Sequence, residues 1–386
     1  MSPQSLPGEN PPLPPPTVVT SPPQLAALVA ALSDEPAIAV DTESNSLYAY
    51  QEQVCLLQIS TPSADYIVDP LSGLDLSPLA RSFADPKLQK VFHAAEYDVM
   101  CLKRDFCFRF ANLFDTMWTA RILGWPRVGL GDVLRETFGV HTKKRYQRYN
   151  WGKRPLEPEA LAYACLDTHY LLSLRRLQTD ALMQKRRLEE AKEVFEQLAA
   201  SEPVSHTFDP EGFWHIKGAF DLTRHEQAVL RELAIWRDRE ARRQDRPHFK
   251  VLDERTLVIL AQATPHTPAE LAGVDGLKSY HVRRYGGRIL RAIKRGTRAR
   301  PPDLPPPPPR HSEAEMDRFH ALRAWRKQAA AERGVDPDVV AGNAALWSLA
   351  EQNPRTPEGL GRIEGLGPWK RKAYGEAILK VLDTGC

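Results

Sequence analysis

Cysteine is scarce in this sequence, and the few cysteines follow no pattern typical of disulfides or metal sites. Five occur among 386 residues, and no two of them form a C-x-x-C pair. We therefore expect reduced thiols, as in a cytoplasmic protein, rather than a disulfide framework or a cysteine-ligated zinc site. Their positions are Cys55, Cys101, Cys107, Cys165 and Cys386.

Long apolar runs are also missing. No segment approaches the roughly 18 consecutive apolar residues that a membrane-spanning helix needs, so we expect no membrane association. The N-terminus has no basic stretch followed by an apolar core, and we therefore expect no secretory signal. It is instead rich in proline, which predicts a disordered or polyproline-like tail over residues 1–20.

The whole chain has little excess charge of either sign, with a formal net charge of +3. The distribution is nevertheless uneven. Residues 1–200 contain 21 Lys and Arg against 24 Asp and Glu, whereas residues 220–300 contain 18 against 10. Residues 311–386 contain 11 of each kind. Positive charge is thus concentrated at 220–300, which favours an acidic partner such as nucleic acid for that segment.

Four carboxylates occur in three separate sequence contexts. Asp41 and Glu43 end an apolar, strand-like run in I-A-V-D-T-E, and alternation along a strand directs both side chains to one face. Asp98 follows a second such run in V-F-H-A-A-E-Y-D, and Asp167 closes Y-A-C-L-D on a predicted helix. Tyr163 lies one helical turn before Asp167, so the two residues share a helix face.

Carboxylates that converge repel one another unless cations lie among them. Oxygen ligands of this kind suit hard divalent cations, and we expect two ions of Mg²⁺ or Mn²⁺. A pair of such ions suits in-line displacement at a phosphodiester bond. The residues themselves therefore indicate a metal-dependent phosphodiesterase, and they do not distinguish RNA from DNA as its substrate.

The motifs D-x-E at Asp41 and Glu43, Asp98, and Y-x-x-x-D at Tyr163 and Asp167 occur in this order along the chain. In this order they resemble the motifs of the DEDD exonucleases, and in particular those of the ribonuclease D family. One subclass of these enzymes has a histidine five residues before the last aspartate. Here that position is Ala162, and Tyr163 marks the tyrosine subclass. Three further stretches are similar to ribonuclease D: L-F-D-T at 113–116, W-G-K-R-P-L at 151–156, and residues 214–257.

The resemblance implies an α/β ribonuclease H-like domain, with a mixed sheet flanked by helices. It implies a 3′→5′ exoribonuclease that releases nucleoside 5′-monophosphates, with tRNA precursors as its RNA substrate. Asp41 would bridge two metal ions, and Glu43 and Asp167 would complete one site. Asp98 would support the other, and Tyr163 would orient the attacking water.

Two rival functions remain open from the residues alone. One is a 3′→5′ exonuclease of the same superfamily that acts on single-stranded DNA. The other is a nucleic-acid-binding protein with a decayed site, which the five intact motif residues disfavour.

Changes of pattern along the chain predict several domains. Short β-rich runs alternate with helical patterns up to about residue 200, which favours a mixed α/β domain. Beyond residue 220 the strand pattern ends, and the sequence matches itself at a shift of 89 residues. Trp236 falls on Trp325 and Tyr285 on Tyr374. Both copies resemble the HRDC domain, a small all-α module.

The expected boundaries follow from these patterns. They are a tail at 1–20, an exonuclease domain at 21–200, a linker at 201–219, a first HRDC domain at 220–299, a polyproline linker at 300–311 and a second HRDC domain at 312–386. Because a stiff proline spacer precedes the second HRDC copy, we expect that copy and the catalytic domain to have separate cores.

The two HRDC copies differ in charge. Basic residues recur at near-helical intervals in the first copy, whereas the second has Ala377 at the position of Arg288. A solvated basic face is the simpler explanation, but the size of the excess favours nucleic-acid contact. The second copy is more typical of a packing or protein-contact module. The candidate nucleic-acid-binding residues are Arg283, Arg284, Arg288, Arg291, Lys294 and Arg295.

Three residues near the motifs permit more than one interpretation. Asp115 is predicted to cap the following helix or to support the site indirectly, rather than to bind metal. His93 is predicted to be structural or to contact substrate, rather than to be catalytic. Gln58 interrupts the apolar run V-C-L-L-Q-I-S, and we predict a buried amide whose hydrogen bonds are satisfied, with substrate contact as the alternative.

The segment 143–154 interleaves basic and aromatic side chains in K-K-R-Y-Q-R-Y-N-W-G-K-R. Such a pattern suits stacking on nucleic-acid bases, and it equally suits a charged surface loop. The resemblance to ribonuclease D favours structural roles for Trp151 and Arg154.

Overall fold

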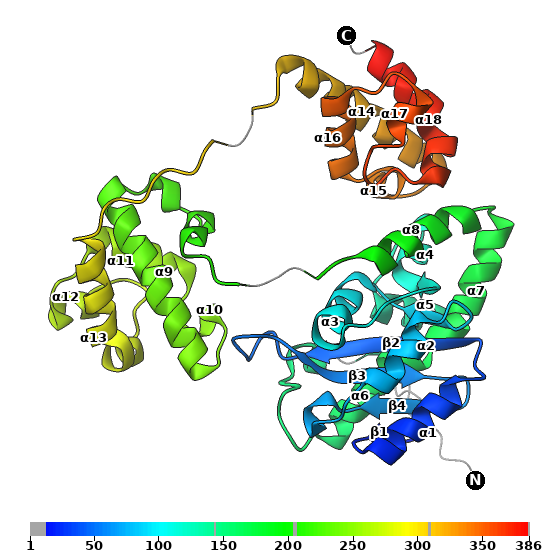
Figure 1. Cartoon of the computed structure of the whole chain (residues 1–386), viewed down its shortest axis with the longest axis horizontal. Coiled ribbons are helices and arrows are strands. Elements are labelled where there is room, and N and C mark those ends of the chain that lie inside the picture. The colour runs from blue at the N-terminus through cyan, green and yellow to red at the C-terminus, as the bar shows by residue number, and fades with distance from the viewer. Residues whose placement is uncertain (1–12, 143, 204–206, 308–309, 385–386) are drawn as a thin grey trace. The chain divides into compact units, whose positions relative to one another are not determined.

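The computed structural model describes residues 13–142, 144–203, 207–307 and 310–384 (Figure 1). Residues 1–12 of the expected tail, Lys143 and Cys386 lie outside these ranges. The chain divides into two compact units. Unit 1 combines residues 1–44, 54–203 and 309–386, and unit 2 combines residues 45–53 and 204–308.

Unit 1 is built on a six-stranded mixed sheet with the order β1-β4-β3-β2-β5-β6. The strands β2, β3 and β4 pair antiparallel, whereas β1 pairs parallel with β4, and β5 pairs parallel with both β2 and β6. The predicted fold class is thus confirmed. The strands are β1 (Thr17–Val19), β2 (Ala37–Ser44), β3 (Val54–Ser60), β4 (Asp65–Val68), β5 (Gln89–Phe92) and β6 (Leu113–Asp115).

The edge strand β1 corrects the expected extent of the tail. It lies within residues 1–20, where the proline content predicted disorder. Its T-V-V sequence is β-branched throughout, which favours a strand. The register pairs Thr17 with Tyr66 and Val19 with Val68. Val19 is fully buried, so the apolar core extends to this edge of the sheet.

Helices cover both faces of the sheet. Alternation along β3 directs Leu57 and Ile59 into the main core on one face and Leu56 into a smaller core on the other. Ala160 and Ala164 of α6 pack in this smaller core, and their small side chains allow the helix to lie close to the strand. The helices of this region are α1 (Pro22–Leu32), α2 (Ala80–Ala84), α3 (Glu96–Phe106), α4 (Thr116–Leu123), α5 (Leu130–Phe138), α6 (Pro158–His169), α7 (Leu171–Gln184) and α8 (Leu188–Ala200).

The two helical repeats have the same element order, and corresponding helices begin 89 residues apart. Each repeat opens with a capping box, in which Thr223 and Ser312 accept hydrogen bonds from the backbone of Glu226 and Glu315. The first repeat comprises α9 (Arg224–Gln244), α10 (His248–Val251), α11 (Glu254–Ala263), α12 (Pro268–Ala272) and α13 (Ser279–Gly296). The second comprises α14 (Glu313–Arg333), α15 (Pro337–Val340), α16 (Asn343–Gln352), α17 (Pro357–Leu360) and α18 (Pro368–Thr384).

The second repeat shares a core with the sheet of unit 1, contrary to the expectation of separate cores. Val339 of α15 is buried within the main core. Arg333 pairs at 2.5 Å with Glu190 of α8, whose side chain is 0% exposed. The backbone N–H of Trp369 donates to Glu193 at 2.6 Å. A proline spacer therefore does not prevent this repeat from packing on the sheet domain.

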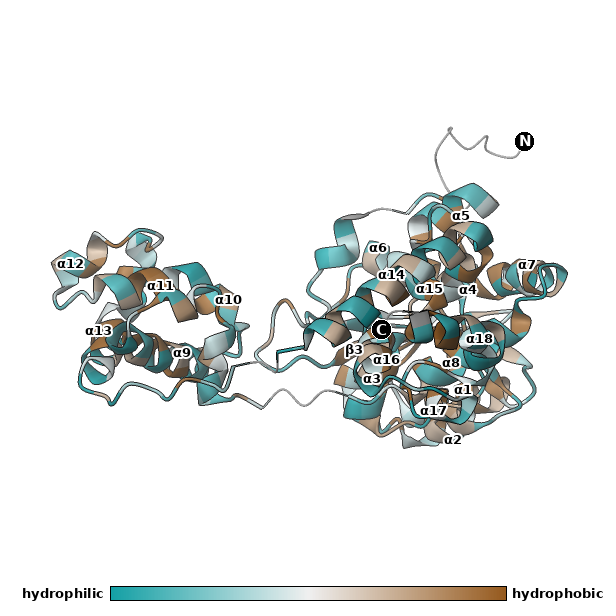
Figure 2. Ribbon diagram, turned by 90° about the horizontal axis from the view of Figure 1, so that it is seen from above, coloured by the Kyte–Doolittle hydropathy of each residue, from teal (hydrophilic) through white to brown (hydrophobic). Residues whose placement is uncertain are grey.

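Unit 2 contains the first repeat together with the tip of the β2–β3 hairpin. The Tyr50 hydroxyl donates to Asp238 at 2.6 Å, and the Tyr50 backbone N–H donates to Asp245 at 3.0 Å. The Lys250 ammonium lies 3.7 Å from the centre of the Tyr48 ring. Helices α9 and α13 carry alternating hydrophobic and hydrophilic stretches, as expected of helices with one buried face (Figure 2).

Two further observations concern the chemistry of the chain as a whole. None of the four cysteines within the described ranges forms a disulfide. Among the described residues, no helix combines the length and the apolar character that a membrane crossing requires.

Candidate active site

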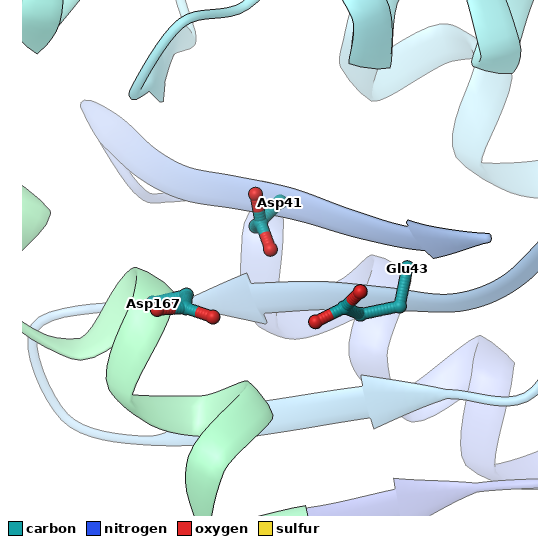
Figure 3. A group of neighbouring side chains, drawn as sticks. All are labelled: Asp41, Glu43 and Asp167. Atoms are coloured by element: carbon teal, nitrogen blue, oxygen red, sulfur yellow. The ribbon is translucent and has the colours of Figure 1, made fainter. Parts of the chain in front are cut away.

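Three of the four predicted metal ligands come together where β2 meets α6. Alternation along β2 places Asp41 and Glu43 on the same face, and α6 presents Asp167 to that face (Figure 3). One carboxylate oxygen from each residue lies within 4.8 Å of those from the other two. The strand and the helix thus bring three acidic groups together in one small volume.

Asp98 lies beside this group but is oriented by a neighbour. It occupies the first turn of α3, and its side chain is buried. One carboxylate oxygen accepts hydrogen bonds from the Thr42 backbone N–H at 3.1 Å and from the Thr42 hydroxyl at 2.5 Å. Thr42 was not singled out from the sequence, although a hydroxyl residue between the two acids of D-T-E is a signal that could have identified it.

All four carboxylates have a raised pKa. Burial is the largest cause at each of them, and neighbouring negative charges add to it. Burial, followed by the charges of Asp167 and Asp98, raises the pKa of Glu43 to about 9. Burial raises the pKa of Asp98 to about 7, against the lowering effect of the Thr42 hydrogen bonds. It also raises the pKa of Asp167 to about 7 and that of Asp41 well above its usual range.

This donor set fits divalent cations. Crowded carboxylates that cannot all ionise at neutral pH without a compensating charge are stabilised by a cation among them. All the converging ligand atoms are carboxylate oxygens, which suit Mg²⁺ and Mn²⁺ rather than softer metals.

Tyr163 lies next to Asp167 and is held by an aromatic wall. Its hydroxyl interacts with the Asp167 carboxylate and lowers the pKa of that group, against the larger effect of burial. Its ring centre is 5.5 Å from that of Tyr146 and 6.3 Å from that of Trp151, with the Trp151 ring stacked at 26°. Burial, followed by the negative charge of Asp167, raises the pKa of Tyr163 well above its usual value. The phenol therefore remains neutral at physiological pH.

The aromatic residues of the segment 143–154 face the core rather than the solvent. Trp151 is 2% exposed and Tyr146 is 4% exposed, which leaves neither ring free to stack on a base. Arg154 forms a bidentate ion pair with Asp69, with both distances 2.7 Å, and also donates to the Cys55 carbonyl at 2.9 Å. The structural interpretation of Trp151 and Arg154 is thus confirmed, and their role is to brace the segment that packs against Tyr163.

The three ambiguous residues near the motifs have different outcomes. Asp115 caps α4 by accepting from the Trp118 backbone N–H at 2.8 Å, as predicted. The Nδ1 atom of His93 lies 2.8 Å from the Thr116 hydroxyl, in agreement with a structural role. The prediction for Gln58 is wrong in one respect. Gln58 is buried, but neither atom of its side-chain amide has a hydrogen-bond partner among the described residues.

The basic residues of the first repeat fall into two groups. Half of the candidates interact within the repeat: Arg288 pairs with Glu240 at 2.8 Å, Arg295 pairs with Glu232 at 2.7 Å, and Arg284 donates to Gln244 at 2.7 Å. The side chains of Arg283, Arg291 and Lys294 are exposed and form no ion pair with another described residue. The second group is therefore available to an external anion.

Comparisons with known families match this division of the chain. A 3′-5′ exonuclease family model matches residues 16–180, and an HRDC domain model matches residues 226–293 and 315–382. The chain is 30% identical over 381 residues to a ribonuclease D of Gluconacetobacter diazotrophicus, covering 96% of this chain and 93% of that relative.

Solved structures show the same relationships. The crystal structure of Escherichia coli RNase D, an exoribonuclease involved in structured RNA processing, has a TM-score of 0.70 and 25% identity, covering 96% of this chain and 99% of the other. The catalytic core of RRP6 from Trypanosoma brucei has a TM-score of 0.66 and 31% identity, covering 73% of this chain and 79% of the other.

Proposed function

The chain belongs to the ribonuclease D family and is a 3′→5′ exoribonuclease, and we propose that its active centre is formed by Asp41, Glu43, Asp98, Asp167 and Tyr163. The observation that supports this proposal is the convergence of three half-buried carboxylates from β2 and α6. Asp98 lies beside them, held by Thr42.

We further propose that the centre holds two divalent cations, Mg²⁺ or Mn²⁺. Asp41, Glu43 and Asp167 would hold one, and Asp98 together with Asp41 would hold the other. When bound, such ions stabilise charge on a scissile phosphate and make water more acidic. The donor set supports this assignment, since all its members are oxygen ligands.

The protein's own groups position the nucleophile. As a neutral phenol, Tyr163 can donate a hydrogen bond to Asp167 and accept a hydrogen bond from water through its oxygen. The water oxygen attacks phosphorus, and the bond from phosphorus to the 3′ oxygen of the preceding nucleotide breaks. The terminal residue leaves as a nucleoside 5′-monophosphate, and the shortened RNA retains a 3′-hydroxyl. The buried wall behind Tyr163 keeps the phenol in place through this step.

RNA is the proposed substrate, with tRNA precursors as its source in the cytoplasm. The exposed group Arg283, Arg291 and Lys294 in the first HRDC repeat supports a role in holding the RNA through its phosphates. We also assign Arg284, Arg288 and Arg295 to this surface, although their internal partners reduce the charge that they offer. Single-stranded DNA is the competing ligand.

The experiment that tests the proposed function compares RNA and DNA strands of the same sequence, labelled at either end. With Mn²⁺ or Mg²⁺ present, 3′-labelled RNA should release its label as a mononucleotide from the first turnover, and 5′-labelled RNA should shorten step by step. Chelation of the metal should stop both. Faster digestion of DNA would contradict the substrate assignment, and internal cleavage products would contradict the exonucleolytic mechanism.

A further inference from the structure

Gln58 is a buried amide whose two polar atoms have no hydrogen-bond partner among the described residues. All seven residues of β3 are buried, and Gln58 itself is 0% exposed. Burying an amide without hydrogen bonds costs free energy, and an apolar residue of the same size would remove that cost. The groups next to Gln58 therefore determine what its amide can bind.

The sheet register places Gln58 directly opposite Asp41. In the antiparallel pair of β2 and β3, Asp41 and Gln58 are Cα partners, and Gln58 faces Ile67 on its other side. Directly opposite residues point to the same face of a sheet, with Cβ atoms about 5 Å apart. The amide of Gln58 is thus on the face that carries Asp41 and Glu43 and that α6 covers.

The other polar group on this face of β3 is already committed. The hydroxyl of Ser60 donates to Asp65 at 2.6 Å and lies 2.7 Å from the hydroxyl of Thr168. Leu56, on the other side of Gln58 along the strand, is apolar and packs in the smaller core. Asp41 is the acidic residue that the sheet register sets directly opposite the Gln58 amide.

We propose that Gln58 is a positioning residue of the active centre, whose side-chain N–H donates to a carboxylate oxygen of Asp41 when the centre holds its cations. A carboxylate that binds metal has further lone pairs, and a donor behind it fixes its orientation and strengthens metal binding. This inference rests on the proposed metal site and adds a residue to it.

The test compares the stability of the full chain without metal with its response to Mn²⁺. Gln58→Met keeps the shape of the side chain and removes both polar atoms. We expect the metal-free variant to melt at a higher temperature than the wild type, because an unpaired buried amide is gone. We expect the Mn²⁺ concentration that gives half of the thermal stabilisation to rise about tenfold or more, because the donor behind Asp41 is gone.

Two controls separate the possible causes. Gln178 of α7 is also fully buried, but its amide donates to the Thr116 carbonyl at 2.8 Å. Gln178→Met should lower the melting temperature and leave the half-saturating Mn²⁺ concentration unchanged. Asp41→Asn should abolish stabilisation by Mn²⁺ at the centre.

The outcomes distinguish this inference from the proposed metal site. If Asp41→Asn abolishes the response to Mn²⁺ and Gln58→Met leaves it unchanged, Gln58 has no positioning role and the metal site stands. Gln58 also has no positioning role if Gln58→Met only lowers the melting temperature. The amide would then stabilise the hydrophobic core and not the metal site. If Asp41→Asn retains the full response, the metal site is wrong and the role of Gln58 is wrong with it.

Discussion

Gln244 in the first HRDC repeat and Arg333 in the second occupy equivalent positions, at the ends of α9 and α14. Each hydrogen-bonds to the equivalent tyrosine of its own repeat, Tyr285 or Tyr374. Gln244 otherwise interacts within its repeat, with Glu240 and Arg284. The guanidinium of Arg333 instead reaches Glu190 of α8, where it neutralises a fully buried carboxylate. At this position the second repeat thus contacts α8 of the catalytic domain, whereas the first repeat makes contacts within itself.

A second pair of equivalent positions shows the same division. Lys250 in the first repeat lies over the ring of Tyr48 at the hairpin tip, whereas Val339 in the second is buried in the main core of unit 1. The first repeat has a charged residue where the second has an apolar, buried one. The duplicated module therefore supplies a basic surface in one copy and structural support in the other.

Arg333→Gln, which introduces the residue of the first repeat, should have the largest effect on stability. Removing one partner of a buried ion pair leaves an uncompensated charge and costs about 3–5 kcal/mol. We expect a clear decrease in the melting temperature of the full chain. The control is Arg355→Gln, because Arg355 pairs with Asp383 at a largely exposed site, where such pairs contribute at most about 1 kcal/mol. Equal effects of the two variants would contradict the structural role of the second repeat.

Neutralising Arg283, Arg291 and Lys294 together should weaken RNA binding without lowering the stability of the chain. We expect stability to be retained, because these side chains have no ion-pair partner among the described residues. RNA affinity should fall, and the slope of log affinity against log salt should decrease by about 0.7 for each lost phosphate contact. The matched control changes Arg323, Lys327 and Arg362 of the second repeat to glutamine. If the control variant decreases the salt slope as much as the test variant does, the first repeat is not the RNA-binding copy.

The acids of unit 1 give the stability of the metal-free enzyme a pH dependence that the basic repeat does not share. Glu43, Asp98 and Asp167 have pKa values raised by folding, so the folded state binds protons more tightly than the unfolded state. Their contribution to stability is present below pH about 4 and is lost as the pH rises through about 7 to 9. In the presence of chelator, this contribution should lower the melting temperature as the pH rises from 5 to about 8. Saturating Mn²⁺ should weaken this trend, and an identical trend with and without metal would contradict the cation site.

The smallest expected effect comes from the paired basic residues of the first repeat. Arg295 is held by Glu232, so Arg295→Gln should change the salt slope less than the loss of an unpaired residue such as Arg291. Glu232→Gln should free Arg295 and steepen the slope slightly. A salt series on the two single variants tests both expectations, and a larger effect for Arg295→Gln than for Arg291→Gln would contradict this distinction.

Local sequence patterns were sufficient to predict much of the fold and of the candidate site. The alternation of side chains along a strand placed Asp41 and Glu43 together, and helical spacing placed Tyr163 beside Asp167. The self-match at 89 residues identified two helical copies, and a hydrophilic residue before a helix identified Asp115 as a cap. These features depend on residues that are close in sequence or on a repeat that is visible in it.

The features that could not be predicted depend on distant pairing. The register of β2 against β3 sets Gln58 opposite Asp41, and no local pattern determines that register. The ion pair of Arg333 with Glu190 joins residues that are 143 positions apart. The role of Arg154 depends on Asp69 in the same way, since a basic loop residue gives no sign of its acidic partner.

Hydrolysis and RNA binding, measured separately for Asp167→Asn, test the proposed active centre most directly. The Asp167 carboxylate is assigned to the chemical step, whereas the first HRDC repeat is assigned a separate role in binding RNA. We therefore expect no detectable release of nucleoside 5′-monophosphate at saturating Mn²⁺, with RNA affinity similar to that of the wild type. Substantial turnover by Asp167→Asn under these conditions would contradict the assignment of the active centre.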